Sequence, residues 1–167
     1  MFNSSNPRVH NSWCFKDGIS NILPDIFERL NSLFVIEISG KLSSEFMKGE
    51  INKLFDLWNK WAVLDYQFLK GLKSTFFRDP NFTLEGIQQN YNNLMKDNSN
   101  DEENKFVLPR LIHLKSYYLK MYESNFDKFN KFCHENGVSS KGDKDTVVAR
   151  VLAFEESNLK KDFLKFV

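Results

Sequence analysis

A chain of 167 residues has the size of one domain, or of one domain with a small appendage, and its 41% hydrophobic residues supply enough apolar material for a core. Gly (7) and Pro (4) are scarce, which favours helices over a turn-rich β protein. The 23 basic and 22 acidic residues leave a net charge of +1, which excludes long-range attraction to nucleic acid or an anionic membrane, so any such binding has to be local.

The N-terminal sequence shows no targeting signal, because it lacks the apolar segment of a signal peptide. No run approaches the roughly 18 apolar residues that a membrane span needs. Cys14 and Cys133 lie far apart and outside any CxxC motif, which is typical of buried thiols in a reducing compartment. The sequence therefore predicts no membrane partner.

The first predicted helix begins near Pro24 and Asp25, which suit the first turn of a helix. Its apolar residues recur at three- and four-residue steps: Leu23, Ile26, Phe27, Leu30, Leu33 and Phe34. Gly40 breaks this pattern. The spacing predicts one apolar face that packs against other helices.

Two more helices are predicted before residue 80. Ser43 or Ser44 can cap the second helix, and Asp65 can cap the third, which ends near Pro80. The inward stripe of the second helix contains Met47, Ile51, Leu54, Phe55, Trp58 and Trp61 or Ala62, and that of the third contains Phe68, Leu69, Leu72 and Phe76. Because these aromatic residues have core spacing, we expect them to pack between antiparallel helices, with Phe55 and Trp58 deeply buried.

An Asn-rich stretch, "QQNYNNLMKDNSNDEENK" at residues 88–105, is poor in apolar side chains. This composition predicts a linker or loop over residues 81–105. The chain then divides into a helical segment at 1–80 and a second segment at 106–167.

The second segment is predicted to hold a long helix followed by a helix hairpin. The long helix carries an apolar stripe of Leu108, Leu111, Ile112, Tyr118, Leu119, Tyr122 and Phe126. In the hairpin, Gly137 suits a helix C-cap and Asp143 or Asp145 an N-cap. The apolar faces of its two helices are Phe129, Phe132 and Cys133, and Val147, Val148, Val151 and Leu152.

No catalytic motif is visible. His10, His113 and His134 have no Cys, Ser or paired carboxylate at motif spacing, and the sequence has no GxGxxG, P-loop or HExxH motif. We therefore expect a non-enzymatic protein without cofactor or metal. An enzyme with a novel helical site is a minor alternative.

Two parts of the sequence resemble a known arrangement of domains. The stretch that contains "NSS", "LPDIFERLN" and "LFDLWNKWAVLDYQFLKGL" resembles the C-terminal half of a CTD-interacting domain, an ENTH/VHS-like right-handed helical superhelix that reads the repeat tail of RNA polymerase II. Residues 129–156, "FNKFCHENGVSSKGDKDTVVARVLAFEE", resemble the SAP-like hairpin that follows this domain in U2 snRNP-associated SURP-motif splicing proteins.

The resemblance implies an all-α fold, a partial superhelix plus a SAP-like hairpin. It also implies a nuclear pre-mRNA splicing factor, a scaffold that binds RNA (pre-mRNA or the U2 snRNP) and spliceosomal proteins. Two alternatives stay open: a SAP-type DNA- or chromatin-binding protein, and a reader of the phosphorylated polymerase tail.

The resemblance places nucleic-acid contacts at Lys141, Gly142, Lys144 and Arg150. Backbone N–H groups at a helix N-terminus, with lysines beside them, suit a phosphate. The alternative is that these lysines are ordinary solvated residues of a structural hairpin, because nearby aspartates reduce the positive charge.

For the polymerase tail, Asn3 matches an asparagine of the family's peptide groove, and Lys53 stands where many members have an arginine. A lysine cannot make the bidentate phosphate contact of an arginine. The aspartate of that groove would lie upstream of Met1.

Half a superhelix would leave apolar stripes facing water. Three expectations follow: the chain is a piece of a longer protein, it self-associates through the exposed half-core, or the later helices fold back and cover the first ones.

Overall fold

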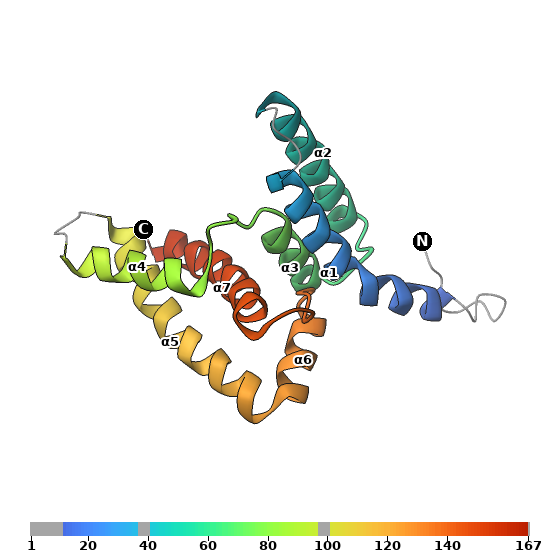
Figure 1. Cartoon of the computed structure of the whole chain (residues 1–167). Coiled ribbons are helices and arrows are strands. Elements are labelled where there is room, and N and C mark those ends of the chain that lie inside the picture. Colours follow the sequence, from blue (N-terminus) through green and yellow to red (C-terminus); the bar gives the residue numbers. More distant parts are fainter. Residues whose placement is uncertain (1–11, 37–40, 97–100, 167) are drawn as a thin grey trace.

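The computed structural model describes residues 12–36, 41–96 and 101–166. Within these ranges the chain forms seven α-helices and no strand, which confirms the all-α prediction (Figure 1). The helices are α1 (Ser12–Ile36), α2 (Lys41–Lys60), α3 (Tyr66–Phe76), α4 (Leu84–Lys96), α5 (Glu102–Ser124), α6 (Phe126–Glu135) and α7 (Lys144–Phe166). None of these helices is long and apolar enough to cross a membrane.

Helix α1 differs from its prediction, because it begins at Ser12 and runs through Pro24. A proline inside a helix removes one backbone hydrogen bond and favours a kink, and α1 visibly changes direction along its length (Figure 1). Pro24 is buried, so packing holds the helix together at this point.

Helices α1, α2 and α3 share a first core, formed by Leu23, Phe27, Phe55, Leu64, Phe68, Leu69, Leu72 and Phe76. Phe55 is 3% exposed as expected, but Trp58 is only half-buried and packs at the edge of this core. Trp61 is 66% exposed, because α2 ends at Lys60 and Ala62 adopts a left-handed conformation with φ of 49°. The inward stripe predicted for α3 is confirmed.

The Asn-rich stretch predicted to be a linker contains α4 instead. Leu84 and Ile87 turn one face of α4 into the second core, where Ile87 is 2% exposed. Thr83 begins the helix, since its hydroxyl accepts a hydrogen bond from the Gly86 amide at 3.0 Å. The asparagines lie on the outer faces of an amphipathic helix, which composition alone did not reveal.

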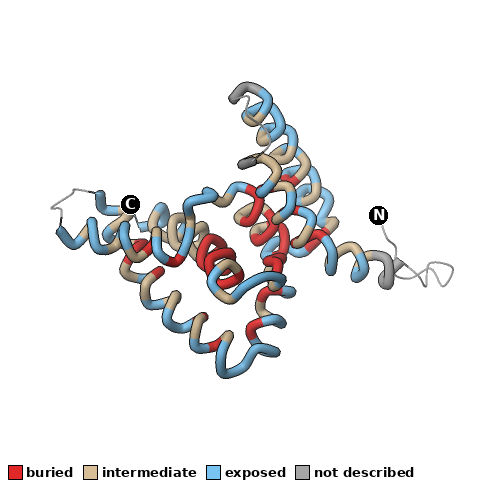
Figure 2. Tube along the Cα trace, in the orientation of Figure 1, coloured by how far each residue is buried: buried red, intermediate tan, exposed pale blue. Residues whose placement is uncertain are grey.

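Helices α4 to α7 build the second core around α7, which contacts α3, α4 and α5. Figure 2 shows buried residues concentrated on α7 and on the helices around it. The predicted inner face of α7 is confirmed, because Val147, Val148, Val151 and Leu152 are fully buried. Cys133 on α6 is also buried, and burial raises the pKa of its thiol to about 12.

The two cores meet where the end of α6 crosses α3. Gly71 on α3 faces Asn136, whose carbonyl oxygen would lie only 1.5 Å from a Cβ atom at position 71. A Cβ atom at Gly137, which has φ of 64°, would lie 2.3 Å from the Phe68 carbonyl oxygen. Two glycines therefore let the backbones touch, and the later helices cover part of α1 and α3.

Candidate nucleic-acid interface

The predicted nucleic-acid residues lie in the turn between α6 and α7, residues 136–143, and on the first turns of α7: Lys141 and Gly142 belong to the turn, and Lys144 and Arg150 to the helix. Gly142 has φ of 122°, a conformation that L side chains rarely adopt, so this turn requires a glycine. Asp143 caps α7: its carboxylate accepts hydrogen bonds from the Thr146 amide at 3.0 Å and from the Thr146 hydroxyl at 2.8 Å. The Thr146 amide bond is the main cause of the lowered pKa of Asp143. A carboxylate of the chain thus already occupies the N-terminus of α7.

Both predicted lysines, Lys141 in the turn and Lys144 at the start of α7, are paired with carboxylates. Lys141 contacts Asp25 of α1 at 2.5 Å, and Lys144 contacts Glu123 of α5 at 2.8 Å. The Lys141 side chain is 81% exposed and that of Lys144 is 41% exposed, so both can still be reached from solvent. Each lysine would have to share its charge between a carboxylate and a phosphate.

Asp25 ties the turn to α1. It accepts hydrogen bonds from the Ser139 hydroxyl at 2.6 Å and from Lys141. Burial by itself would raise the pKa of Asp25, but the hydrogen bonds from Lys141 and Ser139 outweigh it, and the net pKa is lowered.

Arg150 does not belong to an accessible site. Its side chain is only 8% exposed, and its guanidinium donates hydrogen bonds to the carbonyl oxygens of Ser139 and Lys141. Its Nε atom lies 3.0 Å from Glu28 of α1. The guanidinium thus shapes the turn from beneath and links it to α1. The contact of Arg150 with nucleic acid stays a prediction, and it would require this buried side chain to leave its partners.

Glu28 holds two arginines at the junction between the cores. Its Oε1 atom lies 2.7 Å from Arg78 and 3.0 Å from Arg150. All three side chains are at most 14% exposed. Burial lowers the pKa of Arg78, although Glu28 opposes this shift. Buried charges of this kind stabilise a structure only when they stay paired, and the sequence alone did not signal that these three residues meet.

A hollow of about 330 Å³ lies beside the turn, between α1 and α6. His134 on its wall contacts Asn21 of α1 at 2.5 Å, and Ser140 contacts Asn130 of α6 at 2.5 Å. The first contact joins the α6 wall to the α1 wall, and the second links the turn to α6.

The structure describes one of the two predicted peptide-binding residues. Lys53 lies on the exposed side of α2, where it pairs with Glu50 at 2.7 Å. Asn3 lies outside the described residues. A role in binding the polymerase tail thus stays a prediction. His113 and His134 are exposed, and no group of acidic, His and Cys side chains suited to a metal occurs in the described ranges.

The described chain is helical, and the buried polar side chains between its two cores bind one another. Comparison with curated proteins finds two plant relatives. The chain is 22% identical to "Protein RRC1-like" of Arabidopsis thaliana over 172 residues, which include 98% of this chain and 18% of that protein. It is 31% identical to "Protein RRC1" of the same plant over 78 residues, 47% of this chain and 8% of that protein.

The chain thus spans less than a fifth of the length of either relative. No known family profile matches it, and no solved structure is similar.

Proposed function

We propose that this chain is a helical module of a nuclear pre-mRNA processing protein, in which it acts as a non-enzymatic scaffold for spliceosomal RNA and proteins. The observation that carries the proposal is the extent of the similarity to the RRC1-like protein, which runs through 98% of the chain. The alignment with that relative runs through both segments, the one that resembles a CTD-interacting domain and the one that resembles a SAP-like hairpin. In U2 snRNP-associated SURP-motif splicing proteins, which this sequence resembles, a CTD-interacting domain is likewise followed by a SAP-like hairpin.

The geometry is consistent with a scaffold. In the hollow beside the turn, polar side chains such as His134 and Asp25 are hydrogen-bonded to other residues of the chain, and the described residues contain no group suited to hold a metal. Polar groups of the turn and of Arg150 bind Asp25 and Glu28 of α1. These contacts connect the two helical cores.

Association with the U2 snRNP tests the proposal. The epitope-tagged chain is recovered from nuclear extract of its source organism, and co-purifying small nuclear RNAs are measured by quantitative RT-PCR. We expect U2 RNA to be enriched over U1 and U6 RNA and over an unrelated tagged helical protein. Equal recovery of all three RNAs, or cytoplasmic retention of the tagged chain, would contradict the proposal.

A further inference from the structure

The outer side of α5 carries basic and aromatic residues in one line. Arg110, His113, Tyr117 and Lys120 follow one another at steps of three or four residues, so they share one face of the helix. All four are exposed. At a rise of roughly 1.5 Å per residue, Arg110 and Tyr117 are about 10 Å apart along the axis.

The cations of this face differ from those of the predicted site. Lys141, Lys144 and Arg150 are each paired with a carboxylate. Arg110, Lys120 and the neighbouring Lys128 of α6 make no ion pair with any residue the structure describes. Arg110 instead lies over the ring of Phe106, 3.7 Å from its centre, and donates to the Phe106 carbonyl. These three charges are therefore not neutralised within the described protein.

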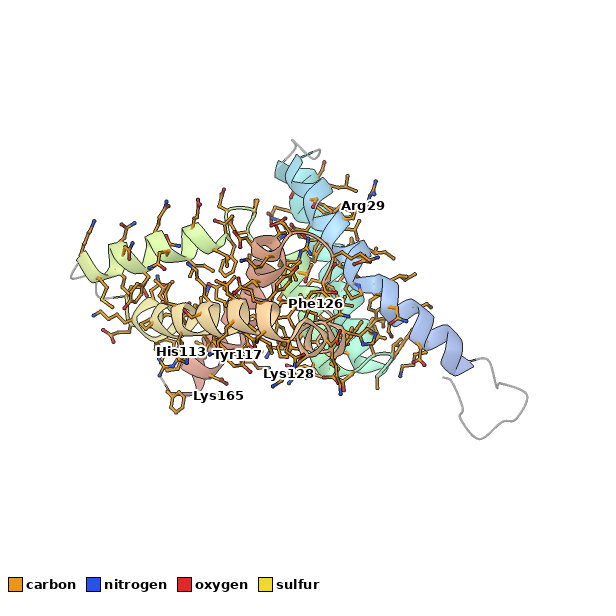
Figure 3. The ribbon with its side chains drawn as sticks, turned by 60° about the horizontal axis from the view of Figure 1, so that its bottom comes forward. Arg29, His113, Tyr117, Phe126, Lys128 and Lys165 are labelled. Carbon is orange, nitrogen blue, oxygen red and sulfur yellow. The ribbon has the colours of Figure 1, made fainter. Side chains whose placement is uncertain are left out.

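A hollow of about 370 Å³ opens beside Tyr117, where α5 meets α6. Its lining residues are Tyr117, Lys120, Met121, Ser124, Asn125 and Lys128. Figure 3 shows Tyr117 between His113 and Lys128 along this edge of the molecule. The Tyr117 ring meets Tyr118 nearly at a right angle, 5.2 Å between centres, and remains 49% exposed.

We propose that this α5–α6 face, formed by Arg110, His113, Tyr117, Lys120 and Lys128, binds single-stranded RNA. A base stacks on Tyr117 above the hollow, and the three free cations contact the phosphates on either side. The inference rests on the proposed function and moves the RNA contact from the turn before α7 to the outer side of α5.

The surrounding charges agree with this assignment. The nearest acidic side chain on α5, Glu123, is held by Lys144, and Asp127 of α6 lines the hollow on the other side, towards α1. A phosphate bound at this face would not have to displace a carboxylate from Arg110, Lys120 or Lys128, although Arg110 already donates one hydrogen bond to the Phe106 carbonyl. A membrane surface would need a broad apolar face, whereas Tyr117 is the one large apolar side chain in this line of four residues.

Fluorescence anisotropy with a labelled oligouridylate tests the inference on the whole chain. The variant Arg110→Ala/Lys120→Ala/Lys128→Ala removes three charges from the face. The matched control, Lys48→Ala/Lys53→Ala/Lys60→Ala, removes three charges from α2. We expect the face variant to reduce the slope of log affinity against log salt by about 2, since each phosphate contact contributes about 0.7 on single strands. The control should keep the wild-type slope.

Substitutions of Tyr117 give a second test that leaves the charge of the face unchanged. Tyr117→Ala should weaken binding roughly tenfold at constant salt, and Tyr117→Phe should keep the affinity, because stacking requires the ring alone. Circular dichroism confirms that each variant is folded.

Three results would overturn the inference: equal slopes for face variant and control, unchanged affinity in Tyr117→Ala, or no binding of oligouridylate by the wild type. Recovery of U2 RNA from extract is an independent readout, so the proposed function can survive if the face does not bind.

Discussion

Arg150 shows why residue type and position along the chain did not settle a role. Its place in the first turns of α7 matched a phosphate-binding position, but its side chain turns inward to Glu28 and to the carbonyl oxygens of the preceding turn. Glu28 comes from a helix more than a hundred residues away, so no local pattern could indicate this partner. Asp143, by contrast, is one of the two residues predicted to cap α7, and it does so, because capping depends on residues three positions apart.

Arg150→Ala is expected to destabilise the protein by about 3–5 kcal/mol, because it leaves Glu28 without one of its two buried partners. Urea unfolding followed by circular dichroism measures the loss. Lys144→Ala should change the stability by less than about 0.5 kcal/mol, because its ion pair is exposed. A stable Arg150→Ala variant with weakened RNA binding would restore the original interpretation.

Asp25 makes the attachment of the turn dependent on pH. Its pKa is lowered in the folded protein, so its stabilising contribution is present above the unfolded pKa near 3.9 and is lost as the pH falls through the folded value. We expect Asp25→Asn to lower the melting temperature at pH 7 and to have little effect at strongly acidic pH. Thermal melts at several pH values check this. A difference that persists at the lowest pH would show that the contact does not depend on charge.

At the scale of elements, the helices with regular apolar spacing were predictable and those with unusual composition were not. The inward faces of α3 and α7 follow directly from three- and four-residue steps. Helix α4 was missed because asparagine has a modest helix propensity, and tertiary packing of Leu84 and Ile87 on α5 outweighs it. Helix α1 was predicted too short, because a buried Pro24 is read from sequence as a helix start.

The second helix is less deeply buried than its aromatic residues suggested. Phe55→Ala should destabilise by about 3–5 kcal/mol, as for other buried aromatic truncations. Trp58→Ala should have a smaller effect, because Trp58 is half-buried and touches the core through the rings of Phe27 and Phe55. Parallel urea titrations compare the two. Equal losses would mean that Trp58 is as central as its position in the stripe predicts.

The contact between α3 and the end of α6 requires a residue without a side chain at position 71. Gly71→Ala would place a Cβ atom 1.5 Å from the Asn136 carbonyl oxygen, so the two helices must separate, at a loss of roughly 1–3 kcal/mol. Gly49→Ala is the matched control: no atom lies within 4 Å of a Cβ there, and alanine favours the helix by about 0.5–1 kcal/mol. Opposite shifts in melting temperature are expected, and a neutral Gly71→Ala would contradict the close approach.

At the scale of the whole molecule, the first three helices do not stand alone. Helix α7 packs on α3, and the turn before it is bonded to Asp25 and Glu28 of α1. This arrangement agrees with the expectation that later helices cover part of the half-core. Self-association stays a prediction, since Phe46 and Trp61 remain more than 60% exposed.

Coupling between the two cores predicts a single unfolding transition. All three tryptophans lie within the first 61 residues, and Trp58 packs against the core of α1–α3, so tryptophan fluorescence follows the unfolding of this part of the chain, whereas far-UV circular dichroism reports every helix. Each core is small, and the buried ion pairs and the Gly71 contact join them, so neither core should persist without the other. We therefore expect both probes to give the same urea midpoint.

Arg150→Ala should separate the two midpoints, with tryptophan fluorescence changing first, because this variant removes a link between α7 and α1 while leaving the hydrophobic residues of both cores in place. Lys53→Ala, which touches only an exposed pair on α2, should leave the midpoints together. Two separate transitions in the wild-type chain would show that the cores are independent, and the junction at Glu28 would then contribute little to the stability of the whole.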